Sequence, residues 1–359
     1  MKVLVVTTKH AASSYYRVRE PARAVSELPL GAEVVVVGGL ATTMSRTPGP
    51  DGPVVVDIDD QGADVVVFQL PKTAELVQMV SILQARGVGV VVEMDDLLTA
   101  VPAGMPGHRR LVMGGMGERA LECARLADHV TVSTPALLTA YAAHGRGTVV
   151  PNAVPRRVAE LPPAYLREPG TATIGWAGSV HGHPYDLPEV GSGLQQALNA
   201  APSRFVVLGE AGDAGQKLGL THAPAEIRWL PDVDSYLRAL GEEFDLGIAP
   251  LRIDRFNTAK SWLKVLEYAA RGVYAVRSPS AEYERLGLGW RARAAKDWAK
   301  GLTKGLLEPE WRTAQARAAR EVVLDRHLTE HTAASWVAAW ERAAEHRGGV
   351  LRRSAVAVG

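Results

Sequence analysis

The chain has little of several things that mark particular protein classes. Its 359 residues include 1 cysteine, Cys123, which excludes an internal disulfide. The residues around Cys123 have the pattern of an amphipathic helix, which favours a buried structural thiol over a nucleophile. The 40 basic residues nearly balance the 39 acidic ones. The resulting net charge of +1 gives no electrostatic argument for binding nucleic acid or an anionic membrane.

Long apolar runs and common catalytic motifs are also missing. No stretch of about 18 apolar residues is present, so no transmembrane helix is expected. The first residues, MKVLVVTT, read as a short strand and not as a signal peptide, so we expect a cytoplasmic protein. No P-loop, HExxH, GxSxG or CxxC occurs, and no GxGxxG follows the first strand. These absences weigh against P-loop NTPases, zincins, α/β-hydrolases and ordinary dinucleotide enzymes.

What the chain does have is a repeated strand–helix pattern. Valine-rich runs at 32–38, 64–69 and 89–93 are apolar throughout, as in parallel strands covered on both faces. Helical patterns separate them, which predicts a doubly wound α/β domain. Five prolines in 151–170 indicate a linker, and after it the strand–helix pattern restarts. Two such domains bind ligands at the carboxyl ends of their strands, so we expect the site in a cleft between them.

The segment 256–272, FNTAKSWLKVLEYAARG, lies between two strand-like runs and is the strongest candidate site. We predict one helix here, with Lys260, Lys264, Glu267 and Arg271 on one stripe. Asn257, Thr258, Lys260 and Ser261 in its first turns are suited to an anion, and Glu267 to hydroxyls. That combination suits a sugar nucleotide. The simpler alternative is a solvated face with a Lys264–Glu267 pair worth only about 0.2–0.5 kcal/mol.

Three loops supply further candidates. The turn GSVHGHPYDL offers Gly178 and Ser179 for close approach of phosphates to the backbone, and His181 for the diphosphate or the sugar. Asp186 is expected to cap a helix over 187–200. After the first strand, Ser13, Ser14, Tyr16 and Arg17 are acceptor or phosphate contacts, or else a helix cap with core tyrosines. A Pro/Gly-rich loop presents His108 as a further acceptor contact.

The strand end EMDDLL, at 93–98, places three carboxylates together. They suit a catalytic base, ligands to acceptor hydroxyls or a metal site, and equally a helix cap and solvated turn charges. Asp95 or Asp96 is our candidate for the base.

The order of motifs resembles that of GT-B glycosyltransferases, within them the family-4-like group (glycosyl transferases group 1), of which the chain looks like a divergent member. The motifs are ADHVTVSTPAL, VVPNAV, TIGWAGS, FVVLGE, IRWLPDVDSYLRAL and LKVLEYAARGVYAV. The last is similar to the segment of that family whose Glu falls at Glu267. The likeness covers roughly residues 127–285 well and the N-terminal third loosely.

The resemblance implies two Rossmann-like domains facing across a cleft. It implies an acceptor domain at 1–155, a linker at 156–170 and a donor domain at 171–325. A helix at 326–345 would cross back to the first domain, and 346–359 would be a disordered tail. The activity implied is metal-independent transfer of a sugar from a nucleotide-sugar donor, with no cofactor. The acceptor would be a hydroxyl-bearing glycan, small molecule, protein or modified nucleic acid.

In that scheme Lys260 would bind the diphosphate, with Lys264 and Asn257 beside it, and Glu267 the ribose. Two departures keep other functions open: Ala259 stands where the family carries a first Glu, and no Arg or Lys follows the glycine turn. A sugar-nucleotide 2-epimerase and a nonenzymatic nucleotide-sugar-binding protein are the alternatives.

Overall fold

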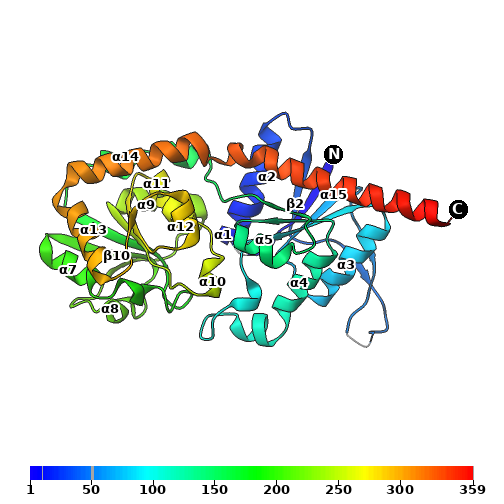
Figure 1. Cartoon of the computed structure of the whole chain (residues 1–359), viewed down its shortest axis with the longest axis horizontal. Helices are drawn as coiled ribbons and strands as arrows, with labels where there is room; N and C mark the ends of the chain where they lie inside the picture. The colour runs from blue at the N-terminus through cyan, green and yellow to red at the C-terminus, as the bar shows by residue number, and fades with distance from the viewer. Residues whose placement is uncertain (10, 50–51, 359) are drawn as a thin grey trace. The chain divides into compact units, whose positions relative to one another are not determined.

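The computed structural model describes residues 1–9, 11–49 and 52–358. By contacts the chain divides into two compact units, and Figure 1 shows their elements. The first comprises Met1–Val101, Gly107–Asn152 and Thr329–Gly359, and the second Pro102–Pro106 and Ala153–Leu328. Residue 10, where the predicted acceptor loop begins, lies outside the described residues.

A parallel sheet forms the centre of the first unit, in the order β2-β1-β5-β6-β7-β8. Its strands are β1 (Lys2–Val6), β2 (Glu33–Val37), β5 (Val65–Gln69), β6 (Gly89–Met94), β7 (His129–Val132) and β8 (Gly147–Val149). Val3 and Val5 of β1 enter one hydrophobic cluster and Leu4 enters another, so successive residues pack on opposite faces. Both faces of the sheet are therefore covered, as the uninterrupted valine runs predict.

Two helices of the first unit, α3 (Ala74–Ala85) and α5 (Pro135–Tyr141), begin at a threonine that caps them. The helices and helical turns of this unit are α1 (Ala11–Ser14), a π-helical turn at Tyr15–Arg19, α2 (Glu20–Glu27), α3, short turns at Leu98–Ala100 and Arg109–Met113, α4 (Met116–Leu126), α5 and α15 (Thr329–Val358). Thr73 caps α3 and Thr134 caps α5, each accepting a backbone N–H with its hydroxyl. Cys123 of α4 is buried, and burial raises the pKa of its thiol to about 12.

Two features of the first unit differ from expectation. A short antiparallel hairpin, β3 (Thr42–Met44) with β4 (Val55–Ile58), was not predicted because its strands are only three and four residues long. The tail at 346–359 was expected to be disordered, whereas α15 continues to Val358, and Gly359 lies outside the described residues. The first half of α15 packs Trp336 and Trp340 in the core of this unit.

The second unit repeats the pattern, with the sheet order β11-β10-β9-β12-β13-β14. The strands are β9 (Ala172–Ser179), β10 (Ser203–Glu210), β11 (Ala225–Ile227), β12 (Leu246–Ala249), β13 (Tyr274–Arg277) and β14 (Trp290–Arg291). All of the pairings in both six-stranded sheets are parallel. The predicted α/β class with two doubly wound sheets is confirmed.

The helices of the second unit include several that are shorter than predicted. They are α6 (Arg156–Ala159), a turn at Ala164–Leu166, a 3-10 turn at Leu187–Val190, α7 (Gly193–Ala200), α8 (Ala214–Lys217), α9 (Val233–Glu243), α10 (Arg255–Thr258), α11 (Leu263–Ala270), α12 (Ala281–Leu286), α13 (Ala295–Leu307) and α14 (Pro309–Arg326). The expected linker thus holds a helix and a turn. The expected helix over 187–200 is interrupted at Gly191, whose φ of 53° lies in the left-handed region.

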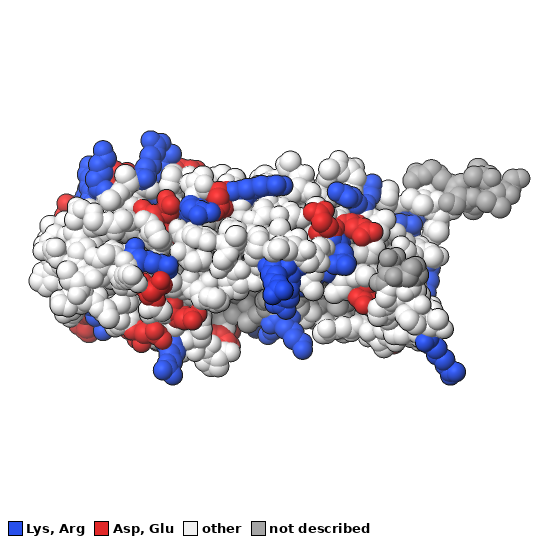
Figure 2. Space-filling view, turned by 90° about the horizontal axis from the view of Figure 1, so that it is seen from below, with Lys and Arg blue, Asp and Glu red and all other residues white. Residues whose placement is uncertain are grey.

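Charged side chains of both signs alternate on the face shown in Figure 2. This distribution agrees with the near-neutral balance of the sequence. Among the described residues, no helix is long and apolar enough to cross a membrane.

Candidate functional site

The predicted helix over 256–272 is two helices, α10 and α11, joined by a turn. Asp254 caps α10 by accepting the Asn257 N–H at 2.8 Å, and α10 ends at Thr258. Lys260 therefore lies in the turn, with its ammonium 4.6 Å from the Phe256 ring, and not in the first turns of a long helix. Arg271, placed on the polar stripe by the sequence, is buried and donates to four backbone carbonyls. The prediction of one helix with a single polar stripe is therefore wrong.

Lys264 of α11, and not Lys260, lies against the end of a central strand. Its ammonium donates to the carbonyl of Ala177 in β9 and lies 5.8 Å from the ring centroid of Trp176. Burial lowers the pKa of Lys264, while Glu267 and Asp186 oppose that shift. A desolvated cation is thus held against the last residues of a central parallel strand, at the edge where such sheets bind ligands.

At the glycine turn beside Lys264, two paired strands meet through glycines. Gly178 of β9 pairs with Gly209 of β10. A Cβ on Gly209 would lie 2.3 Å from the Gly178 carbonyl oxygen, and its φ of 131° also requires glycine. Ser179 receives the Gly182 N–H at 3.1 Å and donates its own hydroxyl to Glu210. The space that a side chain would need at either glycine is filled by the protein itself, by the Trp176 ring at Gly178 and by the Gly178 carbonyl and the Trp229 ring at Gly209.

Glu267 is coupled to two aromatic residues that the sequence reading missed. Its carboxylate is only 5% exposed and accepts the Tyr236 hydroxyl at 2.9 Å. The Tyr236 ring lies 6.4 Å from that of Trp229, which is 55% exposed. A Cβ on Gly209 would touch the edge of the same indole, at 2.9 Å. An exposed flat ring therefore stands between the glycine turn and Tyr236. Trp229 lies in the strand predicted at 226–230 and Tyr236 in the helix predicted at 234–240, and both belong to the motif IRWLPDVDSYLRAL, which was the available signal.

Asp186 joins the glycine turn to α10 and does not cap a helix. It accepts the Asn257 side-chain amide at 2.7 Å, the Arg252 N–H at 3.0 Å and the His183 imidazole at 3.0 Å. Its side chain makes no capping bond to the 3-10 turn that follows. Asn257 is buried, so its amide positions this loop and is not directed at solvent. His181 of the same loop is exposed.

The remaining two candidates of this segment lie near α10. The Thr258 hydroxyl donates to the Asp254 carbonyl at 2.6 Å, and Ser261 is half-buried in the turn before α11. Ala259, which replaces the expected Glu, is buried. No carboxylate therefore stands at this position.

In the first unit, hydroxyl and carboxylate groups meet where β1, β5 and β6 end. Ser13 donates to Asp95 at 2.5 Å and accepts the Gln69 amide at 3.0 Å. Ser14 lies 2.6 Å from the Thr7 hydroxyl, which donates to Gln69 at 3.0 Å. Asp95 is half-buried, and its charge opposes the burial that lowers the pKa of Lys72. The structure thus brings together the predicted Ser13, Ser14 and Asp95.

Arg17 was expected to contact an acceptor or a phosphate, but it belongs to the interior. It is buried, with its guanidinium 2.6 Å from the Glu93 carboxylate and 4.7 Å from the ring centroid of Trp336. It also donates to Val150 and Asn152, and Thr131 donates to Glu93. Burial raises the pKa of Glu93, and Arg17 counteracts this shift. This buried ion pair was not visible in the sequence because its members are 76 residues apart.

Three other predicted residues lie apart from these groups. Tyr16 is buried against Tyr15, with ring centroids 4.9 Å apart, which fits the core alternative. The backbone carbonyl of Asp96 accepts the Tyr141 hydroxyl at 3.0 Å, and its side chain is half-buried. His108 contacts the Val101 carbonyl at 2.6 Å through its Nδ1. Among the described residues, no group of three or more His, Cys, Asp and Glu side chains is placed to hold a metal ion.

No protein-family model matches the chain, and neither does any curated protein. Solved structures do match. A glycosyltransferase from Rickettsia africae ESF-5 has a TM-score of 0.62 at 10% identity, covering 95% of this chain and 98% of that one. Anabaena HepE in complex with UDP has a TM-score of 0.58 at 14% identity, covering 92% of this chain and 96% of that one. WaaG, a glycosyltransferase involved in lipopolysaccharide biosynthesis, has a TM-score of 0.54 at 13% identity, covering 94% of this chain and 99% of that one. The expected GT-B glycosyltransferase fold is confirmed.

Proposed function

We propose that the protein is a glycosyltransferase that takes a sugar from a nucleotide-sugar donor bound in the second unit. The observation that carries this proposal is Lys264, a desolvated cation held against Ala177 at the end of β9. HepE, which shares the fold, has been determined with UDP and with UDP-glucose. Lys264 would supply the positive charge that a donor diphosphate requires if the diphosphate binds beside it and the Gly178–Gly209 pair.

The other groups of this site have roles that follow from their chemistry. Glu267 is an acceptor for the ribose hydroxyls, since its carboxylate is fixed by Tyr236. Trp229 offers an exposed ring on which a nucleobase stacks. Lys260, Asn257, Thr258, Ser261, Ser179 and His181 then form or support the surrounding loops. We propose no metal in this reaction, with the protein cation balancing the charge of the leaving group.

The reaction balances as a substitution at the anomeric carbon. An acceptor hydroxyl oxygen forms the new bond to that carbon, and the bond to the diphosphate oxygen breaks. The nucleoside diphosphate leaves with the electron pair and is stabilised by Lys264. For an inverting reaction, the hydroxyl proton passes to a carboxylate, and Asp95, held by Ser13 in the first unit, is our candidate.

The buried Ala259 is the observation that favours a second candidate function, a nucleotide-sugar-binding protein without transferase activity. Incubation with a nucleotide sugar alone distinguishes the possibilities. Slow release of nucleoside diphosphate indicates a transferase, binding without turnover indicates a binder, and an epimerised donor without release indicates an epimerase.

The test is a thermal-shift series with UDP, GDP, TDP and ADP and their glucose conjugates. At a concentration 100 times its Kd, a ligand that binds only the folded state stabilises it by about 2.7 kcal/mol. We expect one base to raise Tm. Lys264→Met should weaken that binding about 10- to 100-fold, since it removes a charge-assisted contact.

Two further variants make the result specific. Lys296→Met replaces an exposed lysine of α13 and should bind the nucleotide normally. Glu267→Gln retains an acceptor for Tyr236 and should weaken nucleotide binding without a large change in the ligand-free Tm. Normal binding by both Lys264→Met and Glu267→Gln would show that the nucleotide site lies elsewhere.

A further inference from the structure

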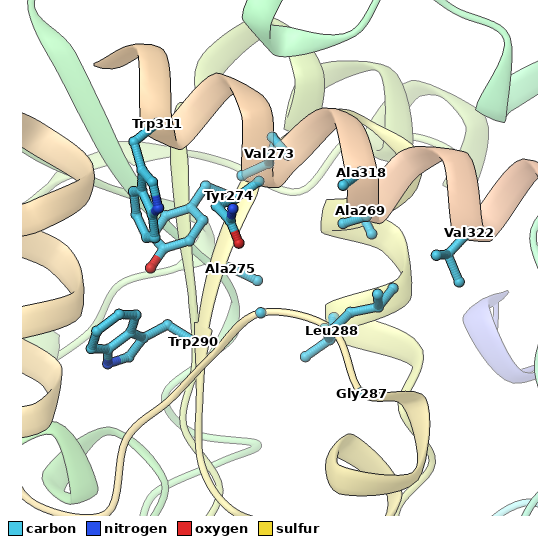
Figure 3. Close-up of a pocket in the computed structure, with 15 residues that line it drawn as sticks. Ala269, Val273, Tyr274, Ala275, Gly287, Leu288, Trp290, Trp311, Ala318 and Val322 are labelled. Carbon is cyan, nitrogen blue, oxygen red and sulfur yellow. The ribbon is translucent and has the colours of Figure 1, made fainter. Parts of the chain in front are cut away.

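A cavity of about 250 Å³ lies within the second unit on the other side of α11 from the proposed donor site. Val265 and Ala269 of α11 line it, whereas Lys264 and Glu267 of the same helix belong to the donor site. Helix α14 and strands β13 and β14 form its other walls (Figure 3). For comparison, an apolar cavity of about 150 Å³ is large enough to bind benzene. This cavity therefore has room for a small organic molecule.

One end of the cavity is aromatic and carries a buried hydroxyl. The Trp311 ring lies 5.3 Å from that of Tyr274 and 6.2 Å from that of Trp290. Figure 3 shows the Tyr274 hydroxyl at this end. Tyr274 is 3% exposed, and within the described parts of the chain its hydroxyl has no hydrogen-bond partner. A buried hydroxyl left without a partner costs about 1–3 kcal/mol, so a ligand oxygen there would remove a real penalty.

The rest of the wall selects against charge. The residues that line the cavity are all uncharged, and most are Ala, Val, Leu or Gly. Lys304 lies 4.3 Å from the centroid of Trp311, and Lys300 lies 5.9 Å from that of Trp290. These two ammonium groups already use the attraction of the indole rings for cations. The lining itself offers no charged group to neutralise a buried charge, and the two nearby ammonium groups would repel a cation.

We infer that this cavity is a binding site for a small neutral aromatic molecule that carries one hydroxyl group. The flat apolar body lies among Trp311, Leu288 and the small residues of α14, and the oxygen exchanges a hydrogen bond with Tyr274. Burial raises the pKa of Tyr274, so the group is a neutral phenol that both donates and accepts. The site is independent of the proposed function, since no residue of the donor site belongs to its wall.

The experiment compares two probes that differ by one hydroxyl, 4-methylphenol and toluene, on the full chain and on Tyr274→Phe. Binding is measured by isothermal titration calorimetry and by ligand-observed NMR. The variant keeps the ring and the shape of the cavity. We expect 4-methylphenol to bind the variant about three- to tenfold more weakly, as for one net hydrogen bond of about 0.7–1.4 kcal/mol. Toluene should bind both proteins equally.

A second pair of variants locates the site. Ala319→Phe on α14 places a ring inside the cavity and should abolish binding of both probes. Ala314→Phe puts the same ring on an exposed part of α14 outside the cavity and should leave binding unchanged. The inference is overturned by any of three results: neither probe binds the unaltered chain at millimolar concentration, binding survives Ala319→Phe, or Tyr274→Phe affects both probes alike.

Discussion

The two units have the same kind of sheet, yet they use the polar residues at their strand ends differently. In the first unit, Arg17 and Glu93 are buried against each other beneath the strand ends. In the second, Lys264 donates to a carbonyl at the strand end, and Trp229 nearby is 55% exposed. The buried charge of Arg17 meets an opposite charge inside the fold, whereas the desolvated cation of Lys264 meets a carbonyl near an exposed aromatic ring, and our proposed donor site rests on that difference.

The largest effect should come from breaking the buried pair of the first unit. Arg17→Met leaves the Glu93 carboxylate buried without its guanidinium, and we expect a loss of about 3–5 kcal/mol of stability. Native-state hydrogen exchange of β6 measures this loss, with β12 of the second unit as the internal control. The double variant Arg17→Met/Glu93→Gln should recover part of the stability. If the amide protons of β6 exchange as slowly as before while activity is lost, Arg17 is a ligand contact and not a structural residue.

The second prediction concerns His129, a buried titratable group of the first unit. Its Nε2 lies 2.8 Å from the Thr148 hydroxyl, and burial, assisted by Arg342, lowers its pKa to about 4. The unfolded chain takes up this proton near pH 6.5, and the folded protein only near pH 4. The stability that His129 provides is therefore complete above pH 6.5 and is lost as the pH falls toward 4, by up to about 3 kcal/mol.

Urea unfolding at pH 7.5, 6, 5 and 4 tests this prediction when the protein is compared with His129→Gln. The difference between the two isolates the contribution of His129 from that of His144, whose pKa is also lowered by burial. The variant should lose less stability between pH 6.5 and 4. Parallel pH profiles for the two proteins would contradict a depressed pKa.

The smallest effect sharpens the functional side of the comparison. Trp229→Ala removes the exposed ring near the glycine turn, and a stacked base lost in this way costs about 1–2 kcal/mol, or five- to thirtyfold in affinity. Binding of UDP, measured by calorimetry, should weaken accordingly, and inorganic pyrophosphate, which has no base, should bind as before. Trp229→Phe keeps a ring and should retain most of the affinity. An equal loss of affinity for UDP and for pyrophosphate would show that Trp229 does not stack on the base.

Sequence reasoning was most successful where patterns are local. The valine runs predicted β5 and β6 because a strand buried on both faces needs apolar residues throughout, and they also located β2, an edge strand whose residues are half-buried or exposed. It failed at 256–272, where a helical spacing of charges suggested one helix. Asp254 caps α10, which is only four residues long, and the chain then turns before α11 begins. The periodicity was correct within α11, which is why Lys264 and Glu267 stayed on one side of it.

The sequence alone determined the alternation of strands and helices, the two α/β units and the position of Glu267, because these depend on neighbours along the chain. Only the tertiary structure decided which polar residues are used internally. Arg17 meets Glu93, Asn257 meets Asp186 and Tyr236 meets Glu267 across separations of 76, 71 and 31 residues. The free energy of a charged or polar group depends on what surrounds it, and distant segments supply those surroundings only when the chain folds.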